Sequence, residues 1–259
     1  MEMIRRTDNG SIRYLELNNH NSKNSLDLEM AKQLLEAVIE ANNKPDCNVM
    51  IFSSTGRAHF SKGPDINQLM LLTEQENGVE LLDDVISILN QIIIEIYESP
   101  KLTIAAIHGY AYGGGLNIML ACDYRLTTDH AKFIESFLSM GVTPDLSSSY
   151  FLPKLIGMTR TTELLFTGRM FTGAEATQWG MFHESYPKRV EMSERAKQLG
   201  EQFEHIPLDI LSNTKMLLRE SLSNSLEEQL TLEKQFIVKA FNDPKIKTNL
   251  MTVNNKKLL

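Results

Sequence analysis

The chain has 259 residues, enough for one large domain that buries roughly three-quarters of its unfolded surface. With 42% hydrophobic residues, 23% charged residues and a net charge of −7, the composition is that of a water-soluble protein and excludes a mainly basic surface for nucleic acid or anionic membranes. Cys47 and Cys122, the two cysteines, lie inside apolar runs, which predicts buried thiols in a reducing compartment.

Targeting and membrane signals are not evident in the sequence. The first ten residues lack the apolar core of a signal peptide, and the uncharged run at 102–122 is interrupted by three glycines and by polar side chains. The C-terminal Lys-Leu-Leu differs from the peroxisomal address Ser-Lys-Leu. We therefore expect a cytoplasmic protein with neither a membrane nor a nucleic-acid partner.

The first third of the chain predicts a hairpin, a helix and a buried strand. Asp8-Asn9-Gly10 is typical of a tight turn, and IRYLEL follows it at 12–17 as a strand. Ser25 or Asp27 is expected to cap the next helix, and residues 48–54 predict a buried strand.

A glycine-bearing loop and a helical region come next. The loop spans residues 55–65 and directly follows the buried strand. Residues 66–99 have helical periodicity, interrupted by a polar loop at 73–78.

The stretch at 102–123 predicts a short strand, a turn of three glycines and a buried helix. Backbone N–H groups at Gly114 and Gly115 would then open the helix, where its macrodipole favours negative charge. The spacing fits neither G-x-G-x-x-G nor a P-loop. Two interpretations stay open, which are an oxyanion hole and close packing of helix on strand.

The remainder changes from mixed to wholly helical patterning. Residues 130–137 predict a strand, a helix is expected to begin near 147–149, and two more helices are expected at 159–168 and 172–182. Beyond about residue 190 only helices are indicated. The expected organisation is an α/β core over 1–190 and a helical C-terminal region over 191–259.

Five motifs in order resemble the crotonase (enoyl-CoA hydratase/isomerase) superfamily. They are NSKNSLD at 21–27, FSKGPD at 60–65, HGYAYGGGLNIMLACD at 108–123, FLSMGVTPDLSSSYFLPKLIG at 137–157 and TGRMFTGAEATQWGM at 167–181. The resemblance implies an α/β fold built as a spiral of ββα units, with a helical C-terminal trimerisation region in a homotrimer or homohexamer. It also implies an acyl-CoA or acyl-carrier thioester as substrate, no further cofactor, and an enolate held by two backbone N–H groups.

By this resemblance, Gly114 and the residue after Gly63 supply those two N–H groups. The residue after Gly63 is Pro64, which has no N–H to donate. Either Asp65 supplies the second donor or Gly114 acts alone, and losing one such donor typically costs roughly 10²–10³ in rate. An activity weakened by Pro64 is therefore expected.

The hydratases of the superfamily have two glutamates in common. By the resemblance, the matching positions here are Asn117 and Phe137. Neither side chain exchanges a proton at neutral pH, so water addition by paired carboxylates is not expected. Glu135 lies two residues before Phe137, and a surface or paired carboxylate is favoured there over a catalytic role.

Asp145 lies where the peroxisomal-type Δ3,Δ2-enoyl-CoA isomerases carry a glutamate. Isomerisation needs one base, which takes a proton from C2 and returns it at C4, and an apolar environment raises the pKa of such a carboxyl. Capping of the following helix is the competing interpretation of Asp145.

The same loop also resembles that of polyketide-pathway crotonase decarboxylases, but the C-terminal histidine of that group has no counterpart in QFIVKAFND at 235–243.

The resemblance places the pantetheine and adenine of coenzyme A beside the FSKGPD loop, and Lys23 lies where the family often has a basic residue near the nucleotide. The expected substrate-binding residues are Ser61, Lys62, Gly63, Pro64, Asp65, Lys23 and Phe137. Lys256 and Lys257 match a terminal basic pair that reaches a phosphate from a neighbouring subunit, although these lysines and Lys23 also suit an ordinary charged surface. The histidines show no metal-ligand spacing, so no metal is expected.

Together these features predict an enoyl-CoA isomerase of the hydratase/isomerase type, with Asp145 as base and Gly114 as oxyanion donor. The alternatives are a crotonase with another reaction, such as a hydratase or decarboxylase, and a catalytically impaired protein that binds acyl thioesters.

Overall fold

The computed structural model describes residues 2–203, 205–244, 246 and 250–251. Its contacts divide the chain into two units, Met1–His205 and Ile206–Leu259. The first unit contains two sheets and the helices that cover them.

The larger sheet has six strands in the order β1-β2-β3-β5-β7-β10. Their bounds are Ile4–Asn9, Ile12–Leu17, Val49–Ser54, Leu102–Ile107, Tyr124–Thr128 and Glu184–Tyr186. The pair β1–β2 is antiparallel and turns at Gly10, as the sequence predicts, whereas the other neighbours are parallel. Every residue of β5 is buried, as expected for a parallel strand covered on both faces.

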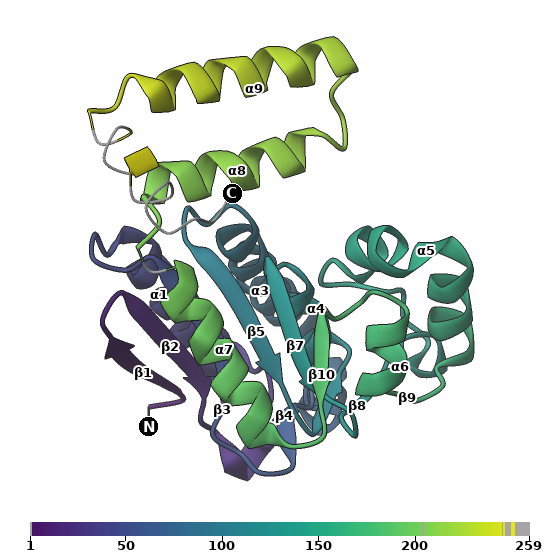
Figure 1. Ribbon diagram of the computed structural model, residues 1–259. Coiled ribbons are helices and arrows are strands. Elements are labelled where there is room, and N and C mark those ends of the chain that lie inside the picture. The colour runs from purple at the N-terminus through teal and green to yellow at the C-terminus, as the bar shows by residue number, and fades with distance from the viewer. Residues whose placement is uncertain (1, 204, 245, 247–249, 252–259) are drawn as a thin grey trace. The chain divides into compact units, whose positions relative to one another are not determined.

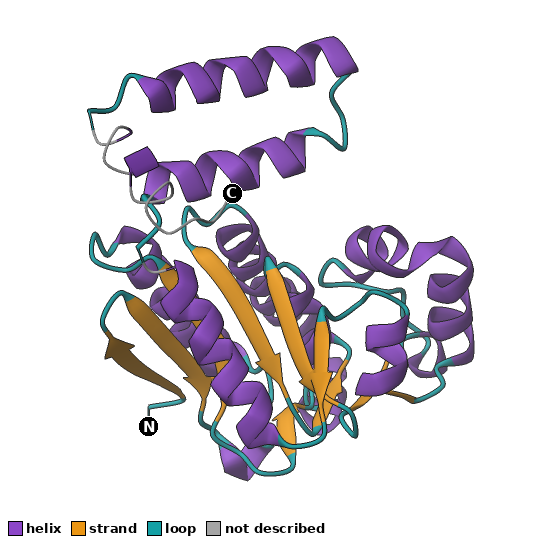
Figure 2. Ribbon diagram, viewed as in Figure 1, coloured by secondary structure: helices purple, strands orange, loops and turns teal. Residues whose placement is uncertain are grey.

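The smaller sheet has four strands in the order β4-β6-β8-β9, with bounds His59–Ser61, Tyr110–Tyr112, Lys132–Ile134 and Phe171–Thr172. β4, β6 and β8 are parallel to one another. Successive strands alternate between the sheets, because β3, β5 and β7 lie in the larger sheet and are followed by β4, β6 and β8 in the smaller one (Figure 2). The α/β spiral of ββα units is thereby confirmed.

The helices of the first unit are α1 (Leu28–Asn43), α2 (Ile66–Thr73), α3 (Gly78–Tyr97), α4 (Gly114–Leu120), α5 (Ser148–Thr167), α6 (Gly173–Gln178) and α7 (Arg189–Phe203), with short 3₁₀ turns at His20–Ser22 and Leu138–Met140. Asp27 caps α1 by accepting from Met30 N over 2.8 Å, so Asp27 and not Ser25 is the cap. The two helices expected on either side of residue 158 both lie within α5, where the non-helical Gly157, with φ of 74°, separates them by a kink.

Helices cover both faces of the larger sheet. α7 lies on one face, and α1 and α3, which pack against each other, lie on the other (Figure 1). Cys47 and Cys122 belong to the buried core, as the sequence predicts.

The unit boundary falls later than residue 190, where the strand pattern ends. α7 groups with the α/β core because it packs against β3, β5, β7 and β10. The second unit contains α8 (Leu208–Glu220) and α9 (Leu226–Phe241), and α9 begins with a capping box between Ser225 and Glu228. Lys256 and Lys257 lie outside the described residues, and in the part of the chain that is described no helix has both the length and the apolar character needed to cross a membrane.

Candidate active site

Three loops meet at one edge of the smaller sheet. Because β4, β6 and β8 are parallel, their carboxyl ends lie at the same edge, and the segments that follow them begin there. These segments are residues 62–65, residues 113–115 and residues 135–147. Every predicted site residue except Ser61, which ends β4, and Lys23 lies in one of them.

The first two loops touch through their backbones. A methyl group added at Gly63, whose φ is +72°, would lie 2.6 Å from the carbonyl oxygen of Tyr112 and 3.6 Å from Gly114 N. A methyl group at Gly115 would lie 2.7 Å from the carbonyl oxygen of Ser61. Both positions therefore require glycine, since any side chain would separate the loops.

The segment containing Lys23 is tied to the first loop by a buried asparagine. Asn24 Nδ2 donates to the carbonyl oxygen of Phe60 over 2.8 Å, and Ser61 Oγ donates to the carbonyl oxygen of Asn24 over 2.7 Å. Leu26 N then donates to the carbonyl oxygen of Gly63 over 3.0 Å. The backbone of Lys23 is thus held beside the 62–65 loop, where its carbonyl oxygen accepts from Lys62 N over 3.2 Å.

The charges around this loop are already partly paired. Burial lowers the pKa of His59, and the charges of Lys23 and Lys62 lower it further. Lys62 forms an ion pair with Asp65, which lowers the pKa of Asp65. A ligand phosphate would therefore compete with Asp65 for Lys62, whereas Lys23 is exposed.

Asp65 is also a helix cap. Its side chain accepts from Asn67 N over 2.9 Å at the start of α2. Pro64 precedes it, half-buried, with Cδ 3.7 Å from where a methyl group at Gly114 would lie. The position matching the second oxyanion donor thus faces Gly114 without an N–H.

Gly114 opens α4, so its N–H has no carbonyl acceptor within the helix and points along the positive end of the helix dipole. A methyl group there would lie 2.5 Å from Leu146 Cδ1 and 3.4 Å from Leu26 Cδ1. Apolar side chains therefore surround this donor, and a low local dielectric strengthens its interaction with negative charge.

Asp145 is presented by a strained turn in the third loop. Leu146 and Ser147 have left-handed φ values of 45° and 69°, a conformation that costs non-glycine residues roughly 1–2 kcal/mol each. Ser148 fixes the turn by donating its N and Oγ to the carbonyl oxygen of Asp145 over 3.1 and 3.0 Å. Strain of this kind persists where the surrounding structure holds it, often at functional sites.

The carboxyl of Asp145 does not cap α5. The N-cap residue is Ser147, no side chain caps the helix, and only the backbone carbonyl of Asp145 bonds to its first turn. The capping interpretation of Asp145 is therefore wrong. Burial raises the pKa of Asp145 to about 6, so the carboxyl is mostly ionised at pH 7 and more basic than usual.

Glu135 is fully buried, with 0% of its surface exposed, so of the two favoured interpretations, a surface or a paired carboxylate, the surface position is wrong. Asn117, also fully buried, donates Nδ2 to Glu135 Oε2 over 3.4 Å. Burial raises the pKa of Glu135 to about 8; the bond from Asn117 opposes this shift and the charge of Asp145 adds to it. The signal that could have indicated burial is the pair of apolar residues directly before Glu135, Phe133 and Ile134.

Phe137 occupies the position that matches the other hydratase glutamate. Its side chain is 5% exposed, and its Cζ would lie 3.6 Å from a methyl group at Gly113. An aromatic ring therefore packs on the glycine turn at that position.

Among the described residues, no group of three or more His, Cys, Asp or Glu side chains is arranged to hold a metal ion.

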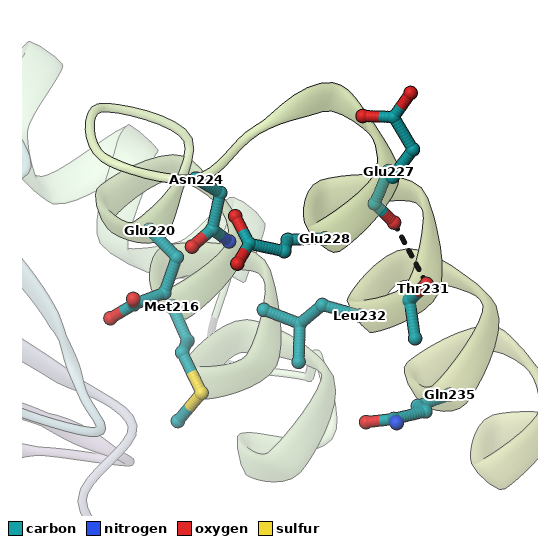
Figure 3. A pocket seen from close by; sticks show the side chains of 8 residues that line it. All are labelled: Met216, Glu220, Asn224, Glu227, Glu228, Thr231, Leu232 and Gln235. Atoms are coloured by element: carbon teal, nitrogen blue, oxygen red, sulfur yellow. Dashed lines mark hydrogen bonds between the residues drawn. The ribbon is translucent and has the colours of Figure 1, made fainter.

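The second unit contains a groove of its own. It lies between α8 and α9 and is lined by Met216, Glu220, Asn224, Glu227, Glu228, Thr231, Leu232 and Gln235 (Figure 3). Thr231 Oγ1 donates to the carbonyl oxygen of Glu227 within it. None of the predicted site residues lines this groove.

Comparisons with known proteins show the family of the chain. The sequence model of the family described as Enoyl-CoA hydratase/isomerase matches residues 7–257. A peroxisomal Delta(3,5)-Delta(2,4)-dienoyl-CoA isomerase of Arabidopsis thaliana is 28% identical, over 89% of this chain and 85% of that protein. 4-Chlorobenzoyl coenzyme A dehalogenase-2 of an Arthrobacter species is 26% identical, over 96% and 88%. The crystal structure of enoyl-CoA hydratase from Bacillus halodurans is 37% identical with a TM-score of 0.81, over 96% of this chain and 99% of that chain.

Proposed function

Because the chain belongs to the enoyl-CoA hydratase/isomerase family, we propose that it is an isomerase that moves a carbon–carbon double bond from the 3 to the 2 position of an enoyl thioester. The relatives described above are named for three different reactions, so their names do not choose among them. The observation that carries the proposal is the carboxyl of Asp145, which is basic, not used as a helix cap, and adjoins Leu146, whose side chain packs against Gly114.

Asp145 acts as the single base. Its carboxylate takes a proton from C2 of the 3-enoyl thioester, and the electron pair moves into the thioester carbonyl to form a dienolate. The same carboxyl then returns the proton at C4, and the double bond is left between C2 and C3. Its raised pKa suits both steps, because a carboxyl near neutrality both accepts and releases a proton readily.

Gly114 N–H holds the dienolate oxygen. The negative charge that forms there meets an N–H with no acceptor in its own helix and the positive end of the α4 dipole. Pro64 supplies no second donor, so we expect slower turnover than a two-donor site would give.

Hydration is disfavoured by the side chains at the two matching positions. Water addition by paired carboxylates needs a base for water and an acid for the α-carbon. Asn117 titrates at no relevant pH, and Phe137 places a hydrocarbon ring against Gly113.

The proposed binding site for the carrier part of the substrate is the first loop, residues 62–65, with Ser61 before it. Coenzyme A, or the pantetheine of an acyl carrier, lies along Ser61, Lys62 and Gly63, with exposed Lys23 beside a phosphate. A homotrimer or homohexamer formed by the C-terminal helices belongs to the same proposal. A second candidate, a binding protein that has lost catalysis, is favoured by Pro64, Asn117 and Phe137 together.

The test is direct incubation with a medium-chain 3-enoyl-CoA, following the absorbance of conjugated 2-enoyl-CoA. Asp145→Asn removes the base with little change in shape, and turnover should fall by at least the 10²–10⁴-fold typical of a lost acid–base group. Asp46→Asn, at an exposed loop aspartate, is the matched control and should retain full activity.

Retained turnover in the Asp145→Asn protein would refute Asp145 as the base. No turnover in the unchanged protein, together with measurable acyl-CoA binding, would favour the binding protein. Formation of a 3-hydroxyacyl product from 2-enoyl-CoA would instead assign the reaction to hydration.

A further inference from the structure

Glu135 is a buried acid with no role in the one-base mechanism. A fully buried carboxyl is costly unless it is neutral or well paired. Its only hydrogen bond between described side chains is the 3.4 Å contact from Asn117. Glu135 Oε1 and Asn117 Oδ1 are both buried and have no partner within the described residues.

Asn117, the hydrogen-bond partner of Glu135, lies on the same helix as Gly114. Asn117 lies one turn after Gly114 on α4, and the carbonyl oxygen of Asn117 accepts from Ser147 Oγ over 3.5 Å. Leu146 packs against Gly114. The strained turn that presents Asp145 and the buried Glu135 thus meet the same four residues of α4.

We propose that Glu135 is a positioning residue that stays protonated and so leaves Asp145 as the only negative charge of the 135–147 loop. This inference deepens the proposed function and rests on it for its kinetic part. A neutral Glu135 has one O–H donor, and Asn117 Oδ1 is an open acceptor, so one buried water or the direct O–H···O bond of a flipped amide satisfies both.

The charges around Glu135 support this assignment. α4 carries no ionisable side chain, and β6 offers only Tyr110 and Tyr112, of which Tyr112 has a pKa raised by burial. Arg169, which follows α5, is paired with Glu163 and Glu175. Among the described groups, Asp145 is the one whose charge acts on the pKa of Glu135.

Two carboxyls whose environments separate their pKa values are a recurrent arrangement for acid–base chemistry. With Asp145 near 6 and Glu135 near 8, one is ionised and the other neutral at pH 7. Above pH 8, ionisation of Glu135 would add a second negative charge beside the forming dienolate and oppose it. A plot of kcat/KM against pH should therefore be bell-shaped, and its two apparent pKa values belong to the pair of carboxyls together.

The first experiment needs no activity. Carbon-13 NMR of protein labelled at glutamate side-chain carboxyls should show one carboxyl that titrates near pH 8, absent in Glu135→Gln. Asp145→Asn should move that titration down by about one unit, the scale of two interacting carboxyls, and the control Asp46→Asn should not. An unchanged titration in Asp145→Asn, or no glutamate that titrates well above its ordinary range, would overturn the inference.

The second experiment is the pH profile of kcat/KM with 3-enoyl-CoA. Glu135→Gln keeps the shape and the contact to Asn117, so the acid limb should remain and the alkaline limb should disappear. An alkaline limb that persists in Glu135→Gln would refute the role in catalysis. Failure of the proposed reaction would leave the NMR result standing, whereas a failed NMR test with normal isomerisation would remove only the role of Glu135.

Discussion

Replacing Gly63 by alanine tests whether close backbone contact holds the site together. The matched control is Gly141→Ala. Both glycines have left-handed φ values, +72° and +76°, so both replacements incur the same conformational cost of about 1–2 kcal/mol. They differ in the space around the new methyl group, because nothing lies within 4 Å at Gly141.

At Gly63 the methyl group would lie 2.6 Å from the backbone carbonyl oxygen of Tyr112, which no rotamer change relieves. Overpacking of this kind typically adds about 1–3 kcal/mol. The free energy of unfolding should therefore fall by about 2–5 kcal/mol in Gly63→Ala and by about 1–2 kcal/mol in Gly141→Ala.

The assay is urea denaturation of both variants at one fixed protein concentration, since association would make apparent stability depend on concentration. Equal losses in the two variants would show that conformational strain alone accounts for the effect, and would refute the argument from contact between the loops.

Three further outcomes follow from the structure. Pro64→Ala supplies an N–H opposite Gly114 and should raise kcat in the enoyl-CoA assay, by up to roughly 10²–10³-fold if the donor is fully aligned; an unchanged kcat would mean that one donor suffices. Asn24→Ala removes buried hydrogen bonds to the backbone and side chains of residues 54–60 and should lower the free energy of unfolding by about 1–3 kcal/mol, measured by urea denaturation, with no loss expected if water replaces the amide. Glu135 has a raised pKa, so its contribution to stability is full below about 4.5 and is lost as pH rises through about 8. Glu135→Gln should thus stabilise the protein by on the order of 2–4 kcal/mol at pH 9 and hardly at pH 4, and an equal effect at both pH values would contradict the buried acid.

Local chemistry explains what the sequence predicts well. The turn at Gly10, the cap at Asp27 and the strand, glycine turn and helix around Gly113–115 depend on residues close together in the chain. Such signals are readable because turn and cap preferences act over a few residues.

Pairing between distant segments explains what the sequence does not predict. The sequence indicates no strand at Tyr124–Thr128 or in the three-residue β4 and β6, because each is short and forms only against neighbours brought from elsewhere. The burial of Glu135 has the same origin, since α4 and the 145–147 turn cover it from other parts of the chain.

The residues that depart from the hydratase pattern fit the proposed isomerisation, in which the site carries one negative charge throughout apart from the Lys62–Asp65 ion pair. In the proposed reaction, Asp145 is ionised before proton removal and neutral after it, when the charge lies on the dienolate oxygen beside Gly114. A single backbone N–H donor stabilises that one negative charge, but it supplies little further stabilisation for a second negative charge. Asn117 and Phe137 replace two potential carboxylates by neutral groups, and Glu135 avoids ionisation through burial. Under the proposed function, each of these side chains keeps negative charge away from the dienolate, which is consistent with a site where Pro64 supplies no second donor.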